Sequence, residues 1–120
     1  MILFEHPLSP YAQKNKIALR EKGLDFELRL PDGLGSGAGY SADFTAASPR
    51  VEVPALIDGD ARVFDSTIIL EYIEDKWPTP ALLPTAPQER ARLRMIEELC
   101  DTYYEAINWA VAEVRVFERA

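Results

Sequence analysis

The sequence has few of the side chains that hold metals or form cross-links. It contains one cysteine, Cys100, and one histidine, His6, in 120 residues. A single cysteine excludes a disulfide within the chain, and two soft ligands are too few for a zinc cluster. We therefore expect neither a structural disulfide nor a metal site.

Basic side chains and long apolar runs are also scarce. Thirteen Lys and Arg stand against 20 Asp and Glu, and the resulting net charge of −7 repels phosphate backbones and anionic lipids. No stretch approaches the roughly 18 apolar residues of a membrane span, and no basic and apolar leader follows Met1. We expect a cytoplasmic protein that binds neither nucleic acid nor membrane.

The remaining composition is that of a folded domain, with 48% apolar and 28% charged residues. The first thirty residues predict a strand, a helix and a strand. Residues 2–4 form a short apolar run, Ser9 and Pro10 are typical of a helix start, and Gly23 is typical of a helix end. Apolar residues alternate with charged ones over 26–30, which indicates a strand with one wet face.

The middle of the chain predicts a loop, a hairpin and a second helix. Four glycines lie in the segment 31–49, which predicts a loop with one helical turn over 42–47. No Gly-Lys-Ser/Thr follows them, so we do not expect a phosphate-binding loop. Asp58-Gly59 predicts a hairpin, and apolar residues at helical spacing predict a helix over 66–76, capped by Asp65 or Ser66.

Four prolines between positions 78 and 87 predict a linker, which divides a first domain (1–77) from a second segment (88–120). The second segment predicts one long amphipathic helix in which Cys100 is buried as a small apolar side chain. The stripe consists of Ile96, Leu99, Cys100, Tyr103, Ile107, Ala110, Val114 and Phe117. Because no partner helix covers this stripe, we expect the start of a larger, truncated helical domain.

Three motifs follow one another in the order and spacing of a known family. They are residues 9–14 (SPYAQK), 48–56 (SPRVEVPAL) and 65–73 (DSTIILEYI). Together they resemble the N-terminal domain of bacterial cytosolic glutathione transferases over residues 1–84, and residues 88–120 resemble the first helix of that family's second domain. The implied fold class is α/β, a thioredoxin-like βαβ-ββα domain followed by the first long helix of an all-α C-terminal domain.

The resemblance implies that Ser9 is the catalytic residue. Thioredoxin-like redox proteins place a cysteine at this helix start, where the helix dipole and free N–H groups stabilise a thiolate. A serine cannot exchange disulfides, but its hydroxyl can donate a hydrogen bond to the sulfur anion of bound glutathione. The alternative is that Ser9 only caps the helix, and the two roles are compatible.

The resemblance also implies a binding site for glutathione. Val53-Pro54 resembles a cis-proline turn whose free backbone groups pair with the cysteinyl part of the peptide. Asp65 and Ser66 would hold the γ-glutamyl amine and carboxylate at a helix N-terminus. The alternatives are a trans proline before an edge strand and simple helix capping.

Glu52, also expected in the glutathione site, departs from the family pattern. The family often has Lys or Gln at this position, where the long polar side chain helps to hold the glycyl end. A carboxylate there would repel the glycyl carboxylate unless Arg50 or a residue of the glycine-rich loop compensates.

Four further residues are expected to line the pocket for a hydrophobic electrophile: Tyr11, Tyr103, Tyr104 and Ile107. For Tyr11 the alternative is helix packing, and for the other three it is a place in the core of the helical stripe. His6 lies three residues before Ser9, but no strained elbow surrounds Ser9, so we expect a loop residue and no Ser–His nucleophile.

The first functional hypothesis is a homodimeric glutathione transferase of the detoxification type, in which the Ser9-stabilised thiolate attacks a small hydrophobic electrophile. Glutathione is then the co-substrate. The second is a non-catalytic binding or regulatory protein on the same scaffold, which Glu52 favours. Disulfide exchange is disfavoured, because Cys100 alone would have to serve.

Overall fold

The computed structural model describes residues 1–118. The chain divides into two compact units, Met1–Leu82 and a second unit that begins at Leu83. The domain boundaries expected from the sequence, 1–77 and 88–120, stay a prediction.

A four-stranded sheet forms the centre of the first unit. Its strands are β1 (Ile2–Phe4), β2 (Glu27–Arg29), β3 (Ala55–Asp58) and β4 (Ala61–Phe64), in the order β2-β1-β3-β4. β1 runs parallel to β2 and antiparallel to β3, and β3 and β4 form the hairpin predicted around Asp58-Gly59. The predicted strands are confirmed.

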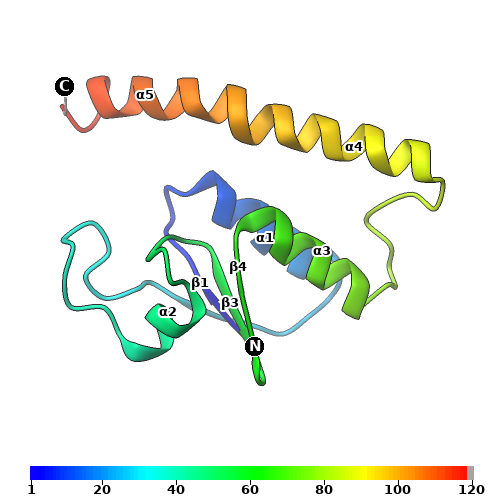
Figure 1. Ribbon diagram of the computed structural model, residues 1–120, viewed down its shortest axis with the longest axis horizontal. Coiled ribbons are helices and arrows are strands. Elements are labelled where there is room, and N and C mark those ends of the chain that lie inside the picture. The colour runs from blue at the N-terminus through cyan, green and yellow to red at the C-terminus, as the bar shows by residue number, and fades with distance from the viewer. Residues whose placement is uncertain (119–120) are drawn as a thin grey trace. The chain divides into compact units, whose positions relative to one another are not determined.

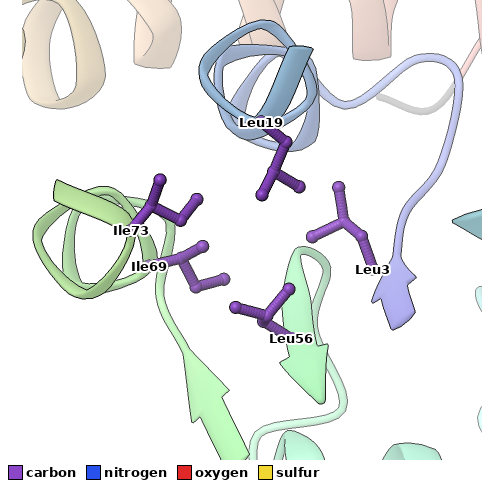
Figure 2. Packing of buried hydrophobic residues seen from close by; sticks show 5 residues of the cluster. All are labelled: Leu3, Leu19, Leu56, Ile69 and Ile73. Atoms are coloured by element: carbon purple, nitrogen blue, oxygen red, sulfur yellow. The ribbon is translucent and has the colours of Figure 1, made fainter. Parts of the chain in front are cut away.

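Helices α1 (Pro10–Glu21) and α3 (Ser66–Lys76) cover one face of this sheet (Figure 1). Between them and the strands lies a cluster of fully buried aliphatic side chains, which Figure 2 shows pointing toward one another from β1, α1, β3 and α3. The cluster consists of Leu3, Leu19, Leu56, Ile69 and Ile73. The two helices are thereby fixed on the same layer, side by side.

The short helix α2 (Ala42–Ala47), which the sequence predicted with the same bounds, packs on the other face of the sheet. Side chains alternate along a strand, so Phe4 points away from the layer that contains Leu3. Phe4 meets Phe44 of α2 with ring centroids 5.2 Å apart. The sheet is therefore covered on both faces.

A buried ion pair joins the C-terminal ends of α1 and α3. The Lys22 side chain is 0% exposed, and its Nζ lies 2.5 Å from Oε2 of Glu74. It also donates to the carbonyl oxygens of Trp77 at 2.6 Å and Pro80 at 2.7 Å. The Glu74 carboxylate accepts from the Leu82 N–H at 3.1 Å. This network, here called the Lys22 latch, ties the segment after α3 to the first unit.

The second unit is a rod of α4 (Pro87–Leu99), the π-helical turn η1 (Cys100–Tyr104) and α5 (Glu105–Arg115). The Glu105 N–H donates to the Cys100 carbonyl, which is the spacing of a π-turn. The expectation of one regular helix over 88–120 is therefore wrong in two respects, because η1 interrupts it and the helix ends at Arg115. Positions 119–120 lie outside the described residues.

The apolar side chains of this rod are exposed. Cys100 was expected to be buried, and this is wrong because no other described element of the unit packs against the rod. Within residues 1–118, no helix has both the length and the apolar character needed to cross a membrane. The exposed large apolar side chains of the rod are Leu93, Met95, Ile96, Leu99, Tyr103, Tyr104, Ile107, Trp109, Val111 and Val114.

Candidate functional site

Ser9 lies at the N-cap of α1, half-buried, with its hydroxyl at the free end of the helix. Its Oγ accepts a hydrogen bond from the Ala12 N–H at 3.2 Å, and Pro10 occupies the first helical position. The capping role is thus present. Among the described residues nothing accepts the hydroxyl proton of Ser9, so this group can donate to an anion held at the positive end of the helix.

His6 does not form a nucleophile pair with Ser9. Its Nδ1 accepts a hydrogen bond from the Leu8 N–H at 3.1 Å, and its backbone carbonyl accepts from the Ser9 N–H at 2.9 Å. The ring therefore shapes the loop between β1 and α1, and the expectation that His6 is a loop residue is confirmed.

The turn before β3 presents an unpaired stretch of backbone. The Val53–Pro54 peptide bond is cis. Neither the N–H nor the C=O of Val53 has a hydrogen-bond partner within the part of the chain that the structure describes. An extended peptide can pair with two such groups as a strand pairs with its neighbour.

Asp65 and Ser66 form the N-terminus of α3. Oδ1 of Asp65 accepts from the N–H groups of Thr67 at 3.0 Å and Ile68 at 3.4 Å, so the expected cap is formed. Asp65 has φ of +74°, a conformation that costs a non-glycine residue on the order of 1–3 kcal/mol. Ser66 is buried. Its N–H belongs to the first turn of α3 and can bind an anion.

Two contacts that the sequence analysis missed connect α1 to this helix end. Asn15 is fully buried, and its Nδ2 donates to the Ser66 carbonyl at 2.8 Å. Nζ of Lys14 donates to Oγ1 of Thr67 at 3.2 Å. The N-terminal half of α1 is therefore held against the start of α3, which brings two helix N-termini into one region. The sequence contains one signal for the first of these contacts, because Asn15 places an amide on the buried face of an amphipathic helix.

Glu52 is exposed and lies in the turn before β3. Its carboxylate forms an ion pair with Arg50, with Nη2 of Arg50 2.6 Å from Oε2 of Glu52. Arg50 thus lies in contact with Glu52, and whether it offsets the repulsion of a glycyl carboxylate stays a prediction.

The expected pocket residues fall in both units. Tyr11 lies in the first turn of α1 and is half-buried. Tyr103 and Tyr104 belong to η1 and Ile107 to α5, and all three are exposed. Their alternative role as core residues is therefore wrong for the described chain. Among residues 1–118, no three His, Cys, Asp or Glu side chains lie close enough to hold a metal ion.

A second charged cluster lies at the far end of α3, away from Ser66. The Asp58 carboxylate forms an ion pair with Lys76 and accepts from the Tyr72 hydroxyl at 2.8 Å. The hydrogen bond from Lys76, followed by that from Tyr72, lowers the pKa of Asp58 below its usual value, although partial burial opposes the shift. This cluster fastens the hairpin to α3.

The chain is similar in sequence to a family of transferases and isomerases. The family model described as glutathione S-transferase, N-terminal domain, matches residues 3–81. Glutathione S-transferase Z2 of Arabidopsis thaliana is 42% identical over 89 residues, which are 74% of this chain and 40% of that protein. Maleylacetoacetate isomerase of Rattus norvegicus is 41% identical over 101 residues, 82% of this chain and 46% of that protein. The chain spans less than half the length of these relatives.

Solved structures give the same result and confirm the predicted α/β fold class. The structure of maleyl pyruvate isomerase, a bacterial glutathione S-transferase of the zeta class, has a TM-score of 0.80 and 30% identity, covering all of this chain and 57% of that one. A glutathione S-transferase of Methylobacterium radiotolerans, in complex with glutathione sulfonate, has a TM-score of 0.77 and 35% identity, covering 90% of this chain and 50% of that one.

Proposed function

The chain belongs to the glutathione S-transferase family, and from this premise we propose that its first unit binds glutathione and activates the thiol at Ser9. The observation that carries the proposal is the hydrogen bonding of Ser9, whose oxygen is fixed by the Ala12 N–H while its proton stays available. A free thiol is only a few per cent thiolate at neutral pH. A hydroxyl donor and a helix N-terminus both lower a thiol pKa, which raises that fraction.

The peptide is held by three parts of the site in this proposal. Val53 pairs with the cysteinyl backbone, since its N–H and C=O are unpaired in the described chain. The γ-glutamyl carboxylate binds the start of α3 at Ser66, and its amine lies at Asp65. Pro54 and Glu52 border the cysteinyl and glycyl parts.

The proposed reaction is attack of the glutathione thiolate on an electrophilic carbon of a small hydrophobic molecule. The sulfur electron pair forms the new C–S bond, and the leaving group departs with the pair of the bond that breaks. Tyr11, Tyr103, Tyr104 and Ile107 are the proposed pocket residues, with a cytoplasmic homodimer as the working form. A second candidate reaction follows from the name of one relative, which is called an isomerase. In it the glutathione thiolate adds to a conjugated double bond of the substrate, and the same thiolate then leaves, so that glutathione is recovered.

The test separates thiol activation from helix capping. Ser9→Ala and Ser41→Ala each remove a serine cap, because Ser41 caps α2 by accepting the Phe44 N–H at 3.3 Å. Both variants lose about 1 kcal/mol of cap energy. Glutathione is titrated into each by calorimetry, and the thiolate absorbance of the bound peptide is followed against pH.

We expect Ser9→Ala to raise the pKa of the bound thiol, whereas Ser41→Ala leaves it unchanged. An equal thiol pKa in all three proteins would remove Ser9 from the mechanism. Absence of glutathione binding to the unaltered chain would instead favour a non-catalytic protein on this scaffold.

A further inference from the structure

Asn15 is a polar side chain in the core of the first unit. It belongs to the buried face of α1, together with Ala12 and Leu19, and it is 0% exposed. Its Nδ2 donates to the Ser66 carbonyl at 2.8 Å. Its Oδ1 is buried and has no hydrogen-bond partner in the described chain. Asn15 therefore uses only one end of its amide.

The unused oxygen of Asn15 opposes folding. Buried polar atoms are nearly always hydrogen-bonded, because a buried acceptor without a donor loses its bonds to water and gains none. An apolar side chain of similar size would avoid this loss. The Ser66 carbonyl would keep a partner, since in a helix it accepts the N–H four residues on. The presence of an amide at position 15 is therefore explained by what its donor does at Ser66, and not by stability.

The first turn of α3 has one backbone donor to offer to a ligand. Oδ1 of Asp65 accepts the N–H groups of Thr67 and Ile68. The carbonyl of Asp65 accepts the Ile69 N–H at 2.9 Å. Within residues 1–118, the N–H of Ser66 has no hydrogen-bond partner. The affinity of this helix start for an anion therefore depends on the orientation of the Ser66 N–H.

Local backbone preference does not fix that orientation. Asp65, which precedes Ser66, has φ of +74°, a value that a non-glycine residue rarely adopts. Such a conformation persists where the surrounding structure holds it. The hydrogen bond from Asn15 anchors Ser66 to α1 through its carbonyl. Lys14 adds a second connection at the hydroxyl of Thr67, at 3.2 Å.

We propose that Asn15 is a positioning residue for ligand binding at the start of α3, and that its amide lowers the stability of the fold. The inference rests on the proposed function, in which the γ-glutamyl carboxylate binds at Ser66. Asn15 is fully buried and acts through Ser66 alone. Its hydrogen bond keeps the Ser66 N–H directed at the carboxylate, so the affinity for the γ-glutamyl part of the peptide depends on it.

The experiment measures binding and stability in the same set of variants. Asn15→Leu and Asn15→Val each replace the amide by an apolar side chain. Leu19→Val is the matched control, because Leu19 is also fully buried on α1 and packs against α3 in the cluster of Figure 2, but it has no polar side-chain atom. Glutathione and cysteinylglycine, which lacks the γ-glutamyl residue, are titrated into each protein and followed by the amide NMR signals. Melting temperatures are measured without ligand.

We expect both Asn15 variants to bind glutathione about 5-fold more weakly than the unaltered chain does, which corresponds to the loss of one neutral hydrogen bond. Their affinity for cysteinylglycine should be unchanged. Their melting temperatures should equal or exceed that of the unaltered chain, because the unpaired oxygen is gone. Leu19→Val should melt at a lower temperature and keep the ratio of the two affinities.

The outcomes separate this proposal from the function on which it rests. An unchanged ratio of the two affinities in the Asn15 variants would overturn the positioning role and leave the glutathione site standing. Melting temperatures of both Asn15 variants below that of the unaltered chain would show that the amide stabilises the fold, which overturns the second part of the proposal. Absence of glutathione binding to the unaltered chain would overturn the positioning role together with the proposed function.

Discussion

Replacing Lys22 by methionine is expected to destabilise the first unit more than the same replacement of the exposed Lys76. The side chain of Lys22 is 0% exposed, and its three ammonium protons face three acceptors within 2.7 Å. Methionine keeps the length and apolar stem but satisfies none of them. The Glu74 carboxylate, 9% exposed, would then keep a buried charge without its cation.

The size of the effect follows from burial. Removal of one partner of a buried ion pair costs about 3–5 kcal/mol, whereas an exposed pair contributes about 0.2–1 kcal/mol. Lys76→Met is the matched control, because Lys76 is also paired with a carboxylate but its side chain is 44% exposed. We therefore expect Lys22→Met to lower the free energy of unfolding by about 4 kcal/mol and Lys76→Met to lower it by less than about 1 kcal/mol.

Urea unfolding of the whole chain measures both free energies of unfolding. Trp77 reports on the latch because its carbonyl is one of the Lys22 acceptors, and a Trp109→Phe background removes the tryptophan of the second unit. Lys22→Met/Glu74→Met should be more stable than Lys22→Met alone, since the lone charge is gone. Equal losses in Lys22→Met and Lys76→Met would refute the reasoning.

Two further predictions concern the hairpin and the glycine-rich loop. Asp58 has a lowered pKa in the folded state. Its contribution to the free energy of unfolding is therefore present above the unfolded pKa of about 3.9 and is lost as pH falls through the folded value. In thermal melts at several pH values, Asp58→Asn should reduce the fall of the melting temperature at acid pH. Gly33→Ala should lower the melting temperature more than Gly35→Ala. Both glycines have positive φ, but a Cβ at Gly33 would lie 1.9 Å from the Ala38 carbonyl oxygen, whereas a Cβ at Gly35 would have no atom within 4 Å. Equal melting temperatures of the two variants would show that the Gly33 clash does not destabilise the fold.

The features that the sequence predicted correctly are those with a local cause. Ser9 followed by Pro10 marks a helix start within a few residues, and the positive φ of Gly23 ends that helix. Asp58-Gly59 defines its hairpin in the same way. In each case the residues that make the signal are also the residues that form the structure.

The features that the sequence did not predict depend on partners far along the chain. Lys22 looks like an ordinary basic residue at a helix end, and its burial arises only when residues 74–80 reach it. Asn15 is similar, because its acceptor belongs to α3. The roles of Ser9, Val53 and Ser66 rested on a family resemblance, and they stay proposals that the binding experiments test.

The π-turn η1 limits what kind of surface can cover the second unit. Each residue advances by about 100° around an α-helix, so the extra residue of a π-turn rotates everything after it by roughly that angle. The apolar side chains of α4, such as Ile96, and those of α5, such as Val114, therefore do not continue one seven-residue seam. A straight partner helix with a regular heptad repeat can follow one half of the rod, and the other half requires a second surface.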